Sequence, residues 1–373
     1  MSNKLSKPTA ISVFSGAGGM DIGVLNAGFD IKVCIEIDEN CCNTLNVNIE
    51  KENRATIVIQ DDIRNVSPNK LIDMTNLVKG DVDLLFGGSP CQAFSQIGKQ
   101  KALEDERGLL LFEIIRFARE IQPKAIVVEQ VKGLLNAKGG NGERGGVMKS
   151  FIKELESLDY VPKWKILKAA EYGIPQMRER LFIVATKKPN GFVFPEQTHI
   201  DPKQCNVLFD LKPYVTVGEA LEGMGEPIVK SNLSIPPEDS HYDITPARDK
   251  VRINGVPEGK YLASQRHLPK EQLCSLSRKD TTKFLRVDRT KPSNTLRCGE
   301  IFFHPVEDRY LTPREYMRIH GFPDSYEFRG PIRGRCGTVR NLDQHRQVAN
   351  SVPPHLAFLI AEQIRLVLNG KNI

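Results

Sequence analysis

The first half of the chain alternates short apolar segments, rich in β-branched residues, with longer segments of helical character. The predicted strands are Ile11–Phe14, Ile31–Ile37, Thr56–Ile59, Val82–Phe86, Ala125–Glu129, Trp164–Ala169 and Leu181–Ala185. Between them lie predicted helices such as Gly19–Ala27, Leu109–Ile121 and Val147–Leu158. Apolar strands separated by helices indicate a mostly parallel sheet that is covered on both faces. The expected fold class is therefore α/β, in which ligands bind at the carboxyl ends of the strands.

The sequence changes character after Thr186. Nine prolines are scattered through residues 187–260 without a clear periodicity, which indicates a second and irregular domain. Helices are predicted again at 309–320 and 354–368. Apolar residues recur every three or four positions in the last helix, so we expect this helix to pack one face against another part of the protein.

Composition excludes several classes of protein. Hydrophobic residues make up 40% of the chain and charged residues 26%, as in globular proteins, which argues against disorder. No apolar run reaches the ~18 residues of a membrane helix, and the first ten residues lack the apolar core of a signal peptide. We therefore expect a cytoplasmic protein without membrane contact. The eight cysteines show no zinc-binding spacing, so we expect no metal site, and we expect Cys34 and Cys298 to be buried.

Positive charge is concentrated in the last third of the chain. Residues 241–350 contain 21 Lys and Arg against 13 Asp and Glu, whereas the formal net charge of the whole chain is only +6. A phosphate-facing surface is one interpretation of this excess, and an ordinary solvated surface is the other. The charge distribution alone does not decide between them.

The segment VFSGAGG at 13–19 joins a predicted strand to a predicted helix. Its glycines allow close approach of a ligand to the backbone, and the helix N-terminus favours an anionic group. The third glycine of a dinucleotide-binding motif is replaced by Asp21, which disfavours a nicotinamide dehydrogenase. Glu36, at the end of the second strand, is suited to the hydroxyls of a ribose, and Asp62, after the third, to the amino group of adenine. These strand ends predict an adenosine-containing cofactor.

The segment GGSPCQAFS at 87–95 follows the strand Val82–Phe86. Two glycines and a proline shape a tight loop that presents the thiol of Cys91 at the same edge of the sheet as the cofactor residues. A reactive cysteine acts as a thiolate and needs partners for the charge that it creates. Glu129, at the end of an apolar strand, and the two arginines of QMRER, Arg178 and Arg180, are candidates. Taken singly, a structural ion pair explains each of these three residues equally well.

Eight blocks in this order resemble the S-adenosylmethionine-dependent cytosine-5 DNA methyltransferases. The blocks are FSGAGG (14–19), GGSPCQAFS (87–95), RGLLLFEIIR (107–116), EQVKGLL (129–135), QMRER (176–180), RTKPSNTLR (289–297), RYLTPREYMRIHGFP (309–323) and QVANSVPP (347–354). The resemblance covers nearly the whole chain except about 190–285. It implies a Rossmann-like methyltransferase domain with a mostly parallel sheet, and a smaller, irregular target-recognition domain inserted before the C-terminal helix.

The resemblance also implies roles for individual residues. Cys91 matches the nucleophile, Glu129 the carboxylate that binds the target cytosine, and Arg178 and Arg180 the pair that organises this site. Matching positions also imply a set of residues that contact S-adenosylmethionine. This set is Phe14, Ser15, Gly16, Gly18, Gly19, Glu36, Ile37, Asp62, Ile63, Leu110, Asn350, Ser351 and Val352.

Three residues depart from the family pattern. Gln130 replaces the usual Asn, whose side chain helps to position the Pro-Cys loop, and a longer amide makes that geometry less certain. His320 stands where Gln is usual, and Ala349 stands where Gly is usual. Since none of the three removes a reacting group, we expect an active enzyme.

By the resemblance, residues 1–188 form the catalytic and cofactor-binding domain, 189–342 the target-recognition domain, and 343–373 a segment that returns to the catalytic domain. The expected partner is double-stranded DNA, with a functional pairing to a restriction endonuclease, and the expected state is a monomer. A tRNA cytosine-5 methyltransferase remains an alternative, although its Cys-Phe-Thr tripeptide is absent. A catalytically inactive DNA-binding homologue is the alternative outside the enzymes.

Overall fold

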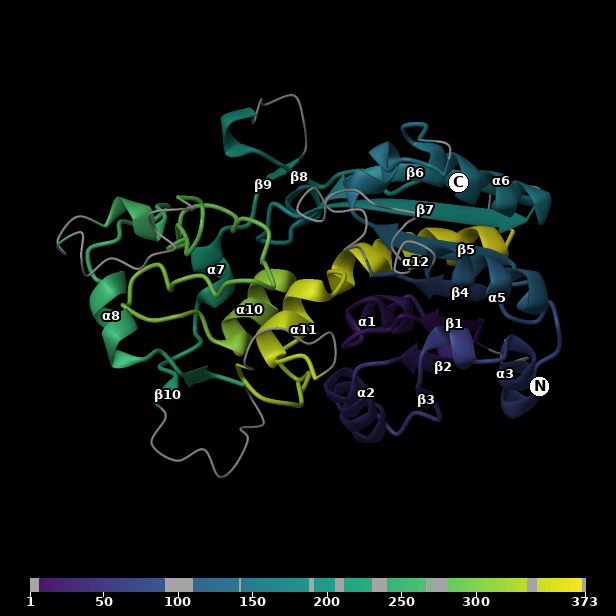
Figure 1. Cartoon of the computed structure of the whole chain (residues 1–373), viewed down its shortest axis with the longest axis horizontal. Helices are drawn as coiled ribbons and strands as arrows, with labels where there is room; N and C mark the ends of the chain where they lie inside the picture. Colours follow the sequence, from purple (N-terminus) through teal and green to yellow (C-terminus); the bar gives the residue numbers. More distant parts are fainter. Residues whose placement is uncertain are drawn as a thin grey trace. The chain divides into compact units, whose positions relative to one another are not determined.

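The computed structural model describes residues 7–90, 110–140, 142–187, 191–204, 211–229, 240–265, 269, 281–333 and 341–370. The chain divides into two compact units, and Figure 1 colours the chain by residue number. The sheet unit contains residues 1–168, 179–196 and 354–373, and the second unit contains residues 169–178 and 197–353. The expected catalytic and target-recognition domains, with boundaries near 188 and 343, stay a prediction.

A seven-stranded sheet forms the centre of the sheet unit, with strand order β3-β2-β1-β4-β5-β7-β6. Its strands are β1 (Thr9–Val13), β2 (Asp30–Glu36), β3 (Ile57–Gln60), β4 (Leu84–Gly87), β5 (Ala125–Gln130), β6 (Tyr160–Lys168) and β7 (Glu179–Lys187). Strands β1 to β5 pair in parallel, whereas β7 runs antiparallel to both β5 and β6. The predicted α/β fold with a mostly parallel sheet is therefore confirmed.

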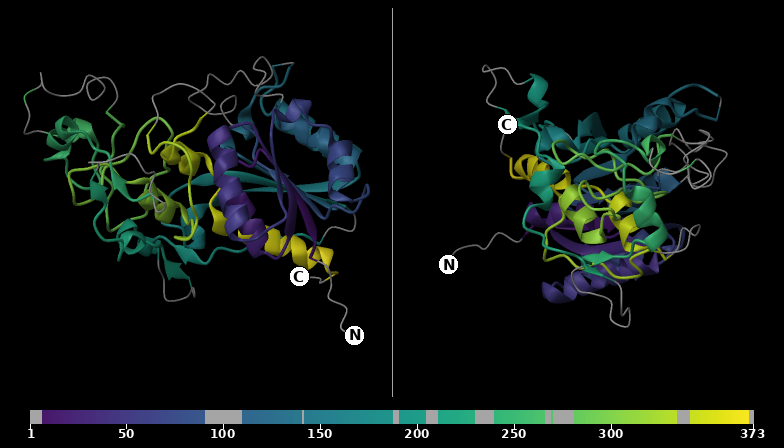
Figure 2. Two further views of the ribbon diagram at one scale, coloured as in Figure 1. Left: turned by 90° about the horizontal axis from the view of Figure 1, so that it is seen from below. Right: turned by 90° about the vertical axis from the view of Figure 1, so that its left-hand side faces the viewer.

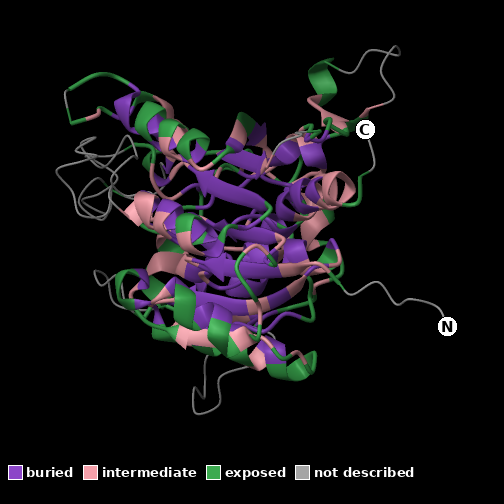
Figure 3. Cartoon of the chain, turned by 90° about the vertical axis from the view of Figure 1, so that its right-hand side faces the viewer, coloured by how far each residue is buried: buried purple, intermediate pink, exposed green. Residues whose placement is uncertain are grey.

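Helices cover both faces of this sheet (Figure 2). They are α1 (Gly19–Asn26), α2 (Glu39–Lys51), α3 (Pro68–Thr75), α5 (Glu113–Ile121), α6 (Gly146–Ser157) and α12 (Pro354–Leu368). One large apolar cluster joins α3, α5 and α6 to the sheet, and its members are almost all completely buried. Figure 3 shows the buried strands at the centre of the unit and the exposed outer faces of the covering helices. The driving force for this unit is thus the burial of aliphatic side chains.

The C-terminal helix α12 packs against α1, near the opposite end of the sequence. Contact is close because Gly23 of α1 has no side chain. A Cβ atom at Gly23 would lie 2.4 Å from the carbonyl oxygen of Pro354 and 2.5 Å from both the Ala357 Cβ and the Phe358 nitrogen. Of the apolar residues predicted to pack from the last helix, Leu356, Ile360 and Ile364 are buried, whereas Leu359, Val367 and Leu368 are half-buried.

The second unit has little regular structure. Its helices are α7 (Val217–Leu221), α8 (Ala247–Ile253), α10 (Pro313–His320) and α11 (Gln344–Asn350). Its strands are the short parallel pairs β8 (His199–Ile200) with β9 (Lys212–Pro213), and β10 (Ile228–Val229) with β11 (Tyr242–Asp243). The irregularity predicted from the proline-rich sequence agrees with this arrangement.

Helix α10 begins four residues later than the predicted 309–320. Thr312 and Glu315 form a capping box, in which each side chain accepts a hydrogen bond from the other residue's backbone, and Pro313 occupies the first helical position. These residues set the start of the helix at Pro313. In the part of the chain that the structure describes, no helix has the length and apolar character needed to cross a lipid bilayer.

Candidate active site

The loop after β1 turns sharply before it enters α1. Phe14, Gly16 and Gly18 all have positive φ angles, of 53°, 53° and 82°, and the helix begins at Gly19. A positive φ is rare for an aromatic residue and is often found where a backbone is shaped for a ligand. A Cβ atom at Gly16 would meet nothing within 4 Å, so the space beside this residue is open.

Glu36 links the end of β2 to this loop. Its carboxylate accepts hydrogen bonds from the backbone nitrogens of Gly16 (2.7 Å), Ile37 (2.9 Å) and Asp38 (2.9 Å). Burial raises the pKa of Glu36, although these three donors oppose the shift. A carboxylate has about four lone-pair sites, so these bonds leave capacity to accept from a hydroxyl group.

Asp62, Ile63 and Leu110 are further predicted cofactor residues of the sheet unit. Asp62 caps a short 3₁₀ turn, and its carboxylate forms an ion pair of 2.7 Å with Arg64. Ile63 is buried in the apolar cluster, and the half-buried Leu110 packs against that cluster. The sequence analysis did not predict the ion pair between Asp62 and Arg64.

Glu129 and Arg180 form an ion pair at the end of β5. The Arg180 Nε lies 2.8 Å from the Glu129 Oε1, and both side chains are nearly buried. Antiparallel pairing of β5 with β7, which sets Glu129 opposite Phe182, brings Arg180 to this position. A Cβ atom at Gly88 would lie 2.9 Å from the Glu129 Oε2, so a larger residue at Gly88 would displace this carboxylate group.

Gln130, the first departure from the family pattern, holds this loop. Its amide nitrogen donates to the backbone oxygen of Ser89 at 2.6 Å and to the Ser89 hydroxyl at 2.7 Å. Its amide oxygen accepts from the Val131 nitrogen at 3.2 Å, and the side chain is completely buried. The longer amide is therefore compatible with a fixed loop up to Pro90. Cys91 lies outside the described residues.

Arg178 has other partners than Arg180. It is 1% exposed and donates hydrogen bonds of 2.9 Å to the carbonyl oxygens of Ala349 and Ser351. The segment at 349–351 thus belongs, with Arg178, to the second unit. The resemblance assigned both arginines to one site. Arg180 pairs with Glu129, and Arg178 bonds the 349–351 segment, so their joint role stays a prediction.

Asn350 ends α11, and Ser351 and Val352 lie between α11 and α12. Ser351 and Val352 are buried, and the exposed Asn350 accepts a hydrogen bond of 2.6 Å from the thiol of Cys298. Cys34 is buried as expected, but Cys298 is exposed, so the expectation of burial was wrong for Cys298. A cysteine next to an arginine and a glycine in a loop has no periodic pattern that would reveal its exposure.

Sequence reasoning missed the part played by two residues. Gln176 and His320 are completely buried and hydrogen-bonded to each other, and His320 also contacts Ser351. The only available signal was the departure of His320 from the usual Gln. Sequence position alone could not place these residues beside the 349–351 segment.

The chain is similar to known proteins over nearly its whole length. Residues 9–366 match the model of the C-5 cytosine-specific DNA methylase family. The Type II methyltransferase M.NgoFVII of Neisseria gonorrhoeae is 32% identical over 372 residues, covering 98% of this chain and 88% of that protein. The Type II methyltransferase M.PspPI of a Psychrobacter species is 36% identical, covering 96% of this chain and 79% of that protein.

Solved structures show the same fold. A crystal structure described as a DNA modification methyltransferase encoded within an Escherichia coli prophage superposes with a TM-score of 0.70 at 23% identity. The alignment covers 97% of this chain and 99% of the other. Because the family model spans nearly the whole sequence and relatives exceed 30% identity over almost its full length, this chain belongs to the C-5 cytosine-specific DNA methylases and is a DNA (cytosine-5-)-methyltransferase.

Proposed function

We propose that this enzyme transfers the methyl group of S-adenosylmethionine to carbon 5 of a cytosine in a specific duplex DNA sequence. The reaction proceeds through a covalent adduct between Cys91 and a base that is flipped out of the helix. The observation that carries this proposal is the pairing of Glu129 with Arg180 beside the loop that leads to Cys91. A carboxylate held in this way, within reach of a Pro-Cys loop, suits a cytosine better than a small polar ligand.

The residues at the carboxyl ends of β1 to β3 fit an adenosine cofactor. Open space beside Gly16 and the remaining acceptor capacity of Glu36 support this fit. When bound, S-adenosylmethionine supplies an electrophilic methyl group. The loop at Phe14–Gly19 would hold its methionine and adenosine parts, Glu36 its ribose, Ile37 and Asp62-Ile63 its adenine. Leu110 and Asn350-Ser351-Val352 complete the proposed set.

Attack by Cys91 makes the target carbon reactive. Carbon 5 of cytosine is a weak nucleophile, but a bond from the Cys91 thiolate to carbon 6 turns it into the nucleophilic end of an enamine. Glu129 shares a proton with ring nitrogen 3 and accepts a hydrogen bond from the exocyclic amine, and so stabilises the charge that develops on the ring. Arg180 orients this carboxylate and bonds the carbonyl oxygen of the base.

Two bonds must then break to release the product. After carbon 5 has gained the methyl group, its proton passes to a base, and the electron pair of that bond expels the Cys91 thiolate from carbon 6. The ring becomes aromatic again, and the enzyme returns to its starting state. Because carbons 5 and 6 are stacked within a duplex, the base has to be flipped out, at a cost of a few kcal/mol.

The biological setting follows from the relatives. Several of them are named Type II methyltransferases, which supports a role in protecting DNA from a cognate restriction endonuclease. We further propose that the enzyme acts as a cytoplasmic monomer. The basic excess of residues 241–350 favours a second unit that faces DNA phosphates.

The decisive experiment measures transfer of a labelled methyl group from S-adenosylmethionine to duplex DNA and, separately, to transfer RNA. Label on DNA cytosine that disappears in the Cys91→Ser variant is expected, and sequencing of the product would give the recognised site. Label on transfer RNA alone would show that RNA, and not DNA, is the substrate. Cofactor binding without any transfer would favour an inactive homologue.

A further inference from the structure

The C-terminal end of α11 is held by side chains from distant parts of the sequence. Arg178 donates from its two terminal nitrogens to the carbonyl oxygens of Ala349 and Ser351, at 2.9 Å each. His320, at the end of α10, contacts the same Ser351 oxygen through its Nε2, also at 2.9 Å. These two contacts use both lone pairs of the Ser351 carbonyl. We call residues 349–351 the clamped segment.

A chain of hydrogen bonds determines which nitrogen of His320 carries the proton. The backbone nitrogen of Leu296 can only donate, and it lies 3.2 Å from the Gln176 Oε1. The amide nitrogen of Gln176 therefore faces the His320 Nδ1, at 2.9 Å, and donates to it. Since Nδ1 accepts, Nε2 must carry the hydrogen that is donated to Ser351. His320 thus serves as a neutral relay, which accepts at one nitrogen and donates at the other.

Gln176 is itself fixed by backbone pairing. The nitrogen of Met177 donates to the oxygen of Ser293 at 2.7 Å, and the nitrogen of Ser293 donates to the oxygen of Pro175 at 2.9 Å. The relay therefore connects three otherwise separate segments, at 175–178, 293–296 and 320, to the clamped segment. Its side chains are shielded from water, because Gln176 and His320 are 0% and Arg178 is 1% exposed. A lost partner in such a place leaves a buried polar group without compensation.

We propose that His320 is a positioning residue for cofactor binding. It holds the Ser351 carbonyl, and with it Asn350 and Val352, in the conformation that the cofactor requires. This inference rests on the proposed function, in which Asn350, Ser351 and Val352 contact S-adenosylmethionine. His320 itself touches neither the cofactor nor the base, and acts only through Ser351.

The test compares three variants of the full-length protein. His320→Leu removes both hydrogen bonds and is expected to raise the dissociation constant for S-adenosylmethionine about tenfold. His320→Gln keeps a donor and an acceptor and introduces the family's usual residue, so binding within about threefold of the wild type is expected. His241→Leu is the matched control, because His241 is a buried histidine of the same unit that contacts Thr312 and Gly225 instead. We expect it to lower the melting temperature without weakening cofactor binding.

Binding is measured by calorimetry without DNA, and KM and kcat are then measured with DNA. A positioning role raises KM for S-adenosylmethionine in His320→Leu and leaves kcat at saturating cofactor within about threefold. Unchanged cofactor affinity in a folded His320→Leu protein would overturn the proposal, and so would an equal loss in His241→Leu. If His320→Leu does not fold, His320→Asn is used, whose shorter side chain cannot reach both partners and should weaken binding in the same direction. A wild-type protein that binds no S-adenosylmethionine would instead refute the proposed function, and this inference with it.

Discussion

The two units of the protein are stabilised in opposite ways. In the sheet unit, a continuous apolar cluster joins the strands to α3, α5 and α6. Several buried polar side chains of this unit lie at the carboxyl ends of the strands. In the second unit, charged groups are part of the interior. Of the residues that the structure describes, all four buried arginines belong to the second unit: Arg178, Arg286, Arg309 and Arg314.

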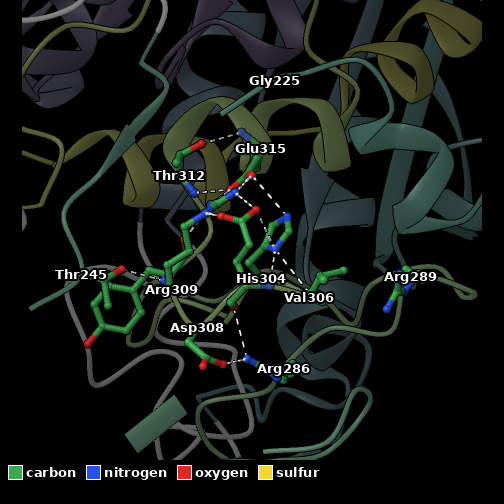
Figure 4. A network of polar contacts seen from close by, with 12 residues as sticks. Gly225, Thr245, Arg286, Arg289, His304, Val306, Asp308, Arg309, Thr312 and Glu315 are labelled. Carbon is green, nitrogen blue, oxygen red and sulfur yellow. Dashed lines mark hydrogen bonds and ion pairs between the residues drawn. The ribbon is translucent and has the colours of Figure 1, made fainter. Parts of the chain in front are cut away.

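Arg309 is an example of a buried charge that is balanced by carboxylate partners in the second unit (Figure 4). It forms ion pairs with Glu315 at 2.7 Å and with Glu307 at 2.8 Å, and Glu315 also caps the start of α10. Burial alone would lower the pKa of Arg309, but the hydrogen bonds to Glu315 and Glu307 raise it. The comparison teaches that the two units use buried charge differently: Glu129 and its partner Arg180 of the sheet unit lie at the end of β5, next to the loop that leads to Cys91. The second unit uses many of its charges for its own stability.

The largest effect is expected from removing a charge inside the second unit. Arg309→Met leaves the buried Glu315 without its cation and should lower the free energy of unfolding by about 3–5 kcal/mol. The measurement is chemical denaturation. Arg119→Met is the control in the sheet unit, because its ion pair with Glu154 is exposed and should contribute less than about 1 kcal/mol. Equal losses in the two variants would contradict the contrast between the units.

A steric change should be the most damaging kind in the sheet unit. Gly23→Ala places a methyl group against the backbone of α12 and should cost about 3 kcal/mol of unfolding free energy, since backbone cannot move aside cheaply. Gly191→Ala is the control, because a Cβ atom there meets nothing within 4 Å. Thermal denaturation of both variants checks the result, and a Gly23→Ala protein as stable as the wild type would show that α12 does not depend on this contact.

A polar change at the ligand edge of the sheet unit should affect the reaction more than the fold. Gln130→Leu removes both hydrogen bonds to Ser89 and should lower kcat for methyl transfer by tenfold to about a hundredfold, because the Pro-Cys loop loses its anchor. Gln60→Leu, at the exposed end of β3, should leave kcat unchanged. Gln130→Asn tests whether the family's usual amide serves here; a normal kcat in Gln130→Leu would show that the loop needs no anchor.

The smallest expected effect is a difference in acid sensitivity. Burial lowers the pKa of His304 and His345 in the second unit, so the unfolded chain binds more protons, and stability falls as pH drops below about 6.5. In the sheet unit burial raises the pKa of Asp21 and Glu36, which has the opposite sign, because their contribution improves as pH falls. The pKa of His355 on α12 is lowered by burial, as it is for the two histidines of the second unit.

Hydrogen exchange at pH 7.5 and 5.5, corrected for the intrinsic rates, measures this difference region by region. Amides of α10 are expected to lose protection by about 1 kcal/mol on acidification, and amides of β1 and β2 by less. An equal loss of protection in α10 and in β1 and β2 would contradict a difference in acid sensitivity between the two units.

Local patterns were sufficient for much of the fold and for part of the site. Apolar β-branched runs predicted the seven strands of the sheet, because such residues favour extended backbone and sheet burial together. The loops after β1 and β4 were found from glycine, proline and cysteine in short segments. The start of α10 was misplaced, because the apolar periodicity extends before Thr312 while the capping box and Pro313 begin the helix later.

Two kinds of information were carried by the sequence without any structure: which segments form strands and helices, and which residues are proposed to supply the chemistry, with Cys91, Glu129 and the glycine-rich loop as examples. Tertiary structure alone decided the partners. It paired Arg180 with Glu129 and Arg178 with Ala349, joined Gln130 to Ser89, and brought Gln176 to His320 and His320 to Ser351. The physical reason is range. Strand and helix preferences act between neighbours along the chain. These contacts join residues 31 to 171 positions apart, and they form only after the backbone has folded and water has been excluded.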